Sequence, residues 1–81
     1  MKLSDIIITQ LQCRLARKAL GWNSRDLAAN ALIGSATVER FESGQTKPIV
    51  ATVAAMRRAF ESEGIEFLGD DGLRVRKRVF A

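Results

Sequence analysis

The stretch that decides the fold is Trp22–Pro48, which reads WNSRDLAANALIGSATVERFESGQTKP. It predicts two short helices that are joined by a tight turn at residues 31–34 and followed by a polar loop. Asn23 is a suitable N-cap for the first helix, and Asp26 follows it at the spacing of a capping box. The second helix is expected over about residues 35–43.

The second expected helix has two different sides. Val38 and Phe41 fall inward, with Glu42 beside them, and Gly44 is suited to the left-handed conformation that ends a helix. The outward side carries small and polar residues, which are Ser35, Ala36, Glu39 and Arg40. Two helices at this spacing are typical of a helix-turn-helix, whose second helix enters the major groove of DNA.

A longer set of residues at fixed spacing carries a resemblance that covers about residues 9–68. They are Arg17, Leu20, Gly21, Trp22, Asp26, Leu27, Ala28, Ala31, Ala36, Thr37, Val38, Phe41, Glu42, Gly44, Lys47, Pro48 and Thr52. Each match alone is common, but the ordered set resembles the Cro and phage-repressor type of helix-turn-helix, the xenobiotic-response-element family of transcriptional regulators.

The resemblance implies a mainly α fold, namely a four-to-five-helix repressor-like DNA-binding domain, to which the residue pattern of the C-terminal part adds a small β-hairpin. One helix-turn-helix domain would span residues 1–81, with a helical core over 9–64 and the hairpin over 65–80. The resemblance also implies an ion pair between Arg17 and Glu42, which fixes helix orientation more than it adds stability.

Two positions depart from the family pattern. Leu32 stands in the turn where the family usually has Gly, and a left-handed Leu costs about 1 kcal/mol or more. Gly34 stands where Ser or Thr often caps the second helix, and Gly is a tolerable cap.

By the same resemblance, the second helix reads bases. The expected base-reading residues are Ser35, Ala36, Thr37, Glu39 and Arg40. Arg40 can bridge the acceptors of a guanine or clamp a phosphate, and Glu39 can accept from a cytosine or be a solvated charge. The expected phosphate contacts are Asn23, Ser24, Ser43, Gln45, Thr46 and Lys47. Without the motif, a solvated surface would be the preferred interpretation of these polar residues.

Two more helices flank this stretch. The first is expected over Gln10–Leu20, where Thr9 and Gln12 form a second capping-box pair. The last is expected over about Val50–Glu63, and its inward stripe comprises Val50, Val53, Met56 and Phe60. The apolar run Ile6–Ile8 fits either a strand or an early start of the first helix.

The C-terminal part alternates apolar and basic residues, a pattern that predicts a β-hairpin over residues 65–80 with Asp71 and Gly72 in the turn. An isolated hairpin is marginal in water, so another element or subunit must cover it. We expect it to form a homodimer interface, with Ile6–Ile8 as a further contributor. The competing idea is that it folds back onto the last helix of its own subunit and that this helix forms the dimer interface.

Composition narrows the class of protein. The 81 residues contain no His and one Cys, and the formal net charge is +4. No zinc-type cluster, phosphate-binding loop or nucleophile–base pair is present, so we expect no enzyme, cofactor or metal. The single Cys and the absence of an apolar run of about 18 residues favour a cytoplasmic protein without a membrane span.

The sequence therefore predicts sequence-specific binding of double-stranded DNA by a small bacterial or phage-type transcriptional regulator, a homodimer on a palindromic operator. The alternative is a protein-interaction module, an antitoxin or anti-regulator, built on the same helices and binding a protein partner.

Overall fold

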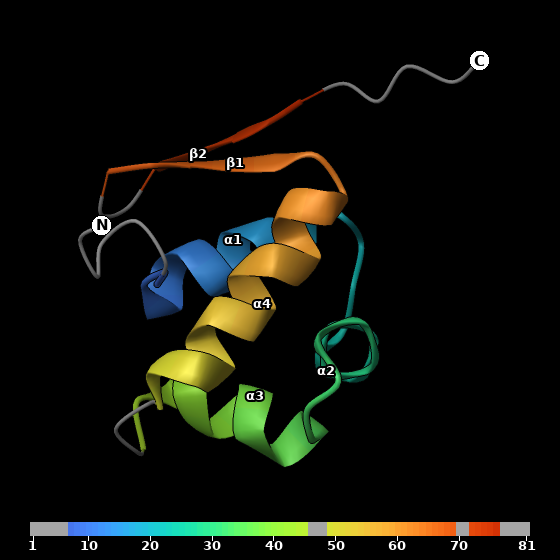
Figure 1. Ribbon diagram of the computed structural model, residues 1–81, viewed down its shortest axis with the longest axis vertical. Coiled ribbons are helices and arrows are strands. Elements are labelled where there is room, and N and C mark those ends of the chain that lie inside the picture. Colours follow the sequence, from blue (N-terminus) through green and yellow to red (C-terminus); the bar gives the residue numbers. More distant parts are fainter. Residues whose placement is uncertain (1–6, 46–48, 70–71, 77–81) are drawn as a thin grey trace.

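The computed structural model describes residues 7–45, 49–69 and 72–76, which form four helices and a two-stranded antiparallel hairpin (Figure 1). In chain order the elements are α1 (Gln10–Ala19), α2 (Ser24–Ala31), α3 (Ser35–Ser43), α4 (Val50–Ser62), β1 (Ile65–Leu68) and β2 (Gly72–Val75). The mainly helical fold with a small C-terminal hairpin is therefore as expected.

Side chains fix the starts of the first two helices. At α1, the Thr9 hydroxyl accepts from the Gln12 amide at 3.0 Å, and the Gln12 side chain accepts from the Thr9 amide at 3.0 Å. At α2, Asn23 and Asp26 exchange the same pair of bonds at 2.8 and 2.9 Å. Both predicted capping boxes are confirmed, and each satisfies backbone donors that a helix start leaves open.

One apolar cluster joins all the helices and the hairpin. Its largest buried side chains include Leu27 from α2, and Met56 and Phe60 from α4. Trp22 stacks on Phe60 with ring centroids 5.8 Å apart. The expected inward stripe of α4 is wrong at one position, because Val50 is 43% exposed. Val50 lies in the first turn of α4, beyond the end of the core.

The hairpin lies across α1 and the C-terminal end of α4, whereas α3 lies at the opposite end of the molecule (Figure 1). Its strands pair in the register Ile65↔Val75 and Phe67↔Leu73. Ile65 is buried in the core, and Phe67 meets Phe60 of α4 edge to face with centroids 6.0 Å apart. The apolar face of the hairpin is therefore covered by helices of its own chain, which agrees with the packing in the competing expectation and leaves its dimer interface a prediction.

The segment before α1 is neither a strand nor a helix over its described residues, Ile7–Thr9. Burial still explains its apolar character, because Ile8 is 5% exposed within the core. Arg57 of α4 holds the segment by donating from Nη1 to the Ile7 carbonyl at 3.1 Å. Ile6 and the expected hairpin residues 77–80 lie outside the described residues.

Candidate functional site

The turn between α2 and α3 has a strained residue at its centre. Leu32 adopts φ 60° and ψ 45°, the left-handed region, while its side chain is 90% exposed. Gly34 follows as the N-cap of α3 in extended backbone, and it supplies no side-chain cap. The turn thus keeps the geometry for which Gly is usual, and the chain bears the strain at Leu32.

The two sides of α3 differ as the sequence predicts. Val38 and Phe41 are buried against the rest of the molecule. The expected base-reading residues all lie toward solvent, with Ser35 half-buried and the other four, Ala36, Thr37, Glu39 and Arg40, exposed. This side therefore combines small side chains with one cation and one carboxylate, so its own net charge is zero.

Two of the candidate residues contact each other. The Ser24 hydroxyl, in the first turn of α2, donates to the Glu39 carboxylate of α3 at 3.3 Å. This bond crosses from one helix to the other. Ser24 and Glu39 can thus reach a phosphate or a base only in competition with it.

The expected phosphate contacts have mixed surroundings. Asn23 uses its Oδ1 to cap α2, and the Ser43 hydroxyl donates to the Arg40 carbonyl at 3.2 Å. Gln45 is exposed after the left-handed Gly44, which ends α3 at φ 75°. Thr46 and Lys47 lie outside the described residues.

A polar network lies beneath these helices. Arg17 of α1 donates from Nε and Nη2 to the two carboxylate oxygens of Glu42 in α3, both at 2.8 Å. Its Nη1 donates to the Trp22 carbonyl at 3.1 Å. The side chains are only 18% and 10% exposed, and the hydrogen bonding that Arg17 donates to Glu42 raises the pKa of the guanidinium. The ion pair implied by the resemblance is formed, and it joins α1 to α3.

Cys13 completes this network from α1. Its Sγ donates to Glu42 Oε2 at 3.2 Å. The residue is fully buried, and burial, followed by the neighbouring Glu42 charge, raises the pKa of the thiol above its ordinary value. A protonated, enclosed thiol of this kind is a core residue and not a nucleophile.

Two features of the structure were not foreseen from the sequence. Gln12, recognised as a capping residue, also holds the hairpin, because its Nε2 donates to the Gly69 and Gly72 carbonyls at 3.0 and 2.8 Å. The second feature is a hollow of about 240 Å³ between α2 and α4. We call it the α2–α4 groove, and it is lined by Asn30, Ala31, Leu32, Ala55, Arg58, Ala59 and Ser62. The alanines in the α2 and α4 sequences were its only signal.

Over residues 7–45, 49–69 and 72–76, the chain brings together no group of three or more His, Cys, Asp or Glu side chains that could hold a metal. In the same ranges, each helix is too short or too polar to cross a bilayer. Neither a protein-family model nor a curated protein matches the sequence.

Proposed function

We propose that this protein binds double-stranded DNA sequence-specifically as a small transcriptional regulator, with α3 in the major groove. The observation that carries the proposal is the outward side of α3, where Ala36 and Thr37 are exposed beside Arg40. Side chains of this size let a helix approach base edges closely, and the major groove is wide enough to admit an α-helix.

Within this proposal the residues of α3 have different roles. Arg40 has no hydrogen bond or ion pair from its side chain to another described residue, so its guanidinium can turn to a guanine. The methyl groups of Ala36 and Thr37 suit thymine. Asn23, Ser24, Ser43 and Gln45 flank this side and would contact phosphates, which position a helix without reading sequence.

Electrostatics supports the same proposal from outside α3. The chain carries a formal net charge of +4, although the outward side of α3 contributes none of it. The attraction to phosphate therefore comes from cations on other surfaces, such as the exposed Arg25 of α2. Binding should weaken as salt rises, because released counterions drive this part of the affinity.

Selection of fragments from a random DNA pool, followed by footprinting, tests the proposal. We expect Arg40→Ala to weaken binding to the selected site by about 1–3 kcal/mol and to relax preference at one base position. Arg58→Ala is the matched control, because it removes the same charge from the α2–α4 groove and not from α3. If Arg40→Ala lost as much affinity for random DNA as for the selected site, and Arg58→Ala lost the same amount on both, Arg40 would act only as a non-specific charge.

We further propose that the regulator is a homodimer, because one recognition helix contacts too few base pairs to find an operator in a genome. The covered apolar face of the hairpin changes how such an interface would form. The two-stranded sheet leaves the outer edges of β1 and β2 without a strand partner in the described chain. Leu68 and Val75 are 44% and 51% exposed there. Pairing between hairpin edges would keep the α3 end of each copy free for DNA.

A further inference from the structure

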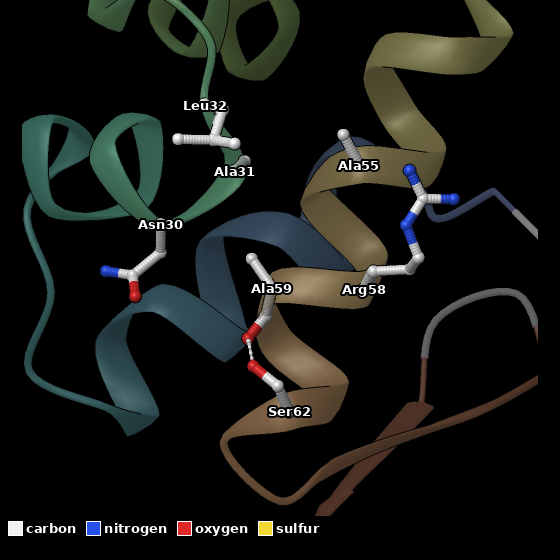
Figure 2. Close-up of a pocket in the computed structure, with 7 residues that line it drawn as sticks. All are labelled: Asn30, Ala31, Leu32, Ala55, Arg58, Ala59 and Ser62. Atoms are coloured by element: carbon white, nitrogen blue, oxygen red, sulfur yellow. Dashed lines mark hydrogen bonds between the residues drawn. The ribbon is translucent and has the colours of Figure 1, made fainter.

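The α2–α4 groove has walls of small apolar side chains and an exposed leucine at its rim (Figure 2). Ala31 ends α2, and Ala55 and Ala59 come from successive turns of α4. Leu32 follows Ala31 in the turn. The hydroxyl of Ser62 is already used, because it donates to the Ala59 carbonyl at 2.8 Å. The lining therefore combines hydrocarbon from the alanines and Leu32 with polar atoms of Asn30, Arg58 and Ser62.

Leu32 gives the groove a second unusual property. Its left-handed backbone is unfavourable by about 1–2 kcal/mol for a residue with a side chain, yet the side chain is 90% exposed and packs little within the chain. A glycine would fit the turn without that strain. A strained residue of this kind is a reason to look for function in a contact outside the chain.

The size of the groove selects among possible occupants. Its volume of about 240 Å³ is below the roughly 300–1,000 Å³ typical of small-molecule sites. It instead suits one or two large apolar side chains. A helix laid along a groove presents such anchors at i, i+3, i+4 and i+7.

Charge decides what kind of helix fits. Arg58 is the charged residue in the lining, and among the described residues it has no hydrogen bond or ion pair. Every described carboxylate is already engaged within the chain: Asp26, Glu39, Glu42, Glu61, Glu63 and Glu66. A second copy docked here about a two-fold axis would present its own Arg58 to this one, because such an interface uses the same patch twice. The complementary occupant is acidic.

We propose that the α2–α4 groove docks an acidic amphipathic helix of another protein, with its apolar residues against Ala55, Ala59 and Leu32 and a carboxylate on Arg58. The residues that line the groove do not include the outward residues of α3. This inference therefore does not depend on DNA binding, and the two fail independently.

The probes are two synthetic helical peptides with Leu at i, i+3, i+4 and i+7. One carries Glu at the flanking positions and the other carries Lys at the same positions. Titration of the ¹⁵N-labelled full chain should show amide shifts from the Glu peptide centred on Leu32, Ala55 and Ala59. The Lys peptide should bind at least about tenfold more weakly, because it places like charges together.

Three variants sharpen the test. Arg58→Glu should reverse the preference between the two peptides, whereas Arg14→Glu, at an exposed position on α1 outside the groove, should not. Leu32→Gly should weaken binding of the Glu peptide by about tenfold while the free protein becomes more stable, a combination that a purely structural Leu32 would not produce. Affinity of the Arg58 variant for DNA should change no more than that of the Arg14 control.

Three results would overturn the proposal. The first is equal binding of the two peptides, or no binding of the Glu peptide up to roughly millimolar concentration. The second is a set of amide shifts centred away from the groove. The third is self-association of the chain that Arg58→Ala strengthens and Ala55→Trp abolishes, since a second copy would then be the occupant.

Discussion

Arg17 and Glu42 show how one residue pair can set the position of a helix. The fork of the guanidinium meets both carboxylate oxygens at 2.8 Å, and a third donor reaches the Trp22 carbonyl. A bidentate pair of this kind is directional. With both side chains mostly withdrawn from solvent, the bonds compensate for desolvation more than they add net stability. The pair therefore orients α3 against α1.

Removing one partner of this pair should be costly. We expect Glu42→Ala to lower the free energy of unfolding by about 2–4 kcal/mol, because it leaves the guanidinium of Arg17 partly buried without a counter-charge. Urea denaturation followed by Trp22 fluorescence measures the loss. Glu61→Ala is the control, since it breaks an i,i+4 ion pair with Arg57 in which the Glu61 side chain is 44% exposed. This variant should lose less than about 1 kcal/mol of unfolding free energy. Similar losses in both variants would contradict this account.

Leu32 should respond in the opposite direction. Leu32→Gly relieves a left-handed strain of about 1–2 kcal/mol but adds freedom to the unfolded chain worth about 0.5–1 kcal/mol. The expected net gain in unfolding free energy is about 0.5–1 kcal/mol. Leu32→Ala keeps a side chain in the same conformation, so it should change stability by less than about 0.5 kcal/mol. A loss of stability in the glycine variant would show that the leucine packs usefully in the free protein.

Sequence reasoning succeeded at these residues where the signal was local or carried by an ordered motif. The two capping boxes, the bounds of α3 and the left-handed Gly44 all follow from spacing within one turn of a helix. The sequence also identifies Leu32 as a departure, because Gly is the residue type favoured in that turn. Its exposure and its place on the rim of the groove depend on α4, which no local pattern describes.

The hairpin shows what an element gains from a single distant side chain. Gln12 is 2% exposed, and all its polar atoms are used between the start of α1 and the two ends of the β1–β2 connection. The bonds to Gly69 and Gly72 join residues 57 and 60 positions apart in the sequence. A buried amide with its partners matched in this way stabilises one arrangement of the elements over others.

Gln12→Met should detach the hairpin while keeping the volume of the side chain. The Thr9 amide and the Gly69 and Gly72 carbonyls would lose their partner. A polar group left unsatisfied costs about 1–3 kcal/mol where it is buried, and less at Gly69, which is exposed. Hydrogen exchange should accelerate first in β1 and β2 and only later in α2 and α3. Gln10→Met changes an exposed residue in the same turn of α1, and it should leave hydrogen exchange in the hairpin unchanged. Uniform acceleration along the chain would mean that the hairpin and the helices open together.

The same hairpin explains why the apolar alternation at the C-terminus was ambiguous. A period of two identifies a face that must be buried, but it does not say whether the cover is a helix of the same chain or a second subunit. Phe67 illustrates the outcome, because it packs on Phe60 and lies under the guanidinium of Arg57, whose Cζ is 5.4 Å from the ring centroid. The period-two pattern does not predict these contacts, because they depend on how β1 packs against α4.

At the level of the whole molecule, α3 and the hairpin lie at opposite ends (Figure 1). This separation would allow the proposed DNA contact and the proposed self-association to occur without overlap. The α2–α4 groove adds a third surface, which uses residues from neither of the other two. Each proposal can therefore be tested by variants that leave the remaining surfaces intact.

Edge pairing predicts a specific effect on assembly. Val75→Lys and Leu68→Lys place charges on exposed positions of the two strands, and edge charges oppose strand pairing between molecules. We expect the double variant to sediment as a monomer and to lose cooperative binding to the selected DNA site. Its thermal midpoint should stay close to that of the unchanged protein. A dimer that persists in this variant would move the interface away from the hairpin edges.

The enclosed thiol of Cys13 is a natural probe of local opening in the core. It is the one cysteine in the chain, and its side chain lies in the core beside Glu42. A thiol reagent can modify it only after the structure opens around α1, because the contacts that enclose the thiol must break to admit the reagent. Under excess reagent, the rate of modification therefore measures how often the structure opens around Cys13, and the measurement needs no added label and no mutation. Bound DNA or a bound peptide that stabilises the closed structure would slow the modification of Cys13, and the slowing would increase with that stabilisation.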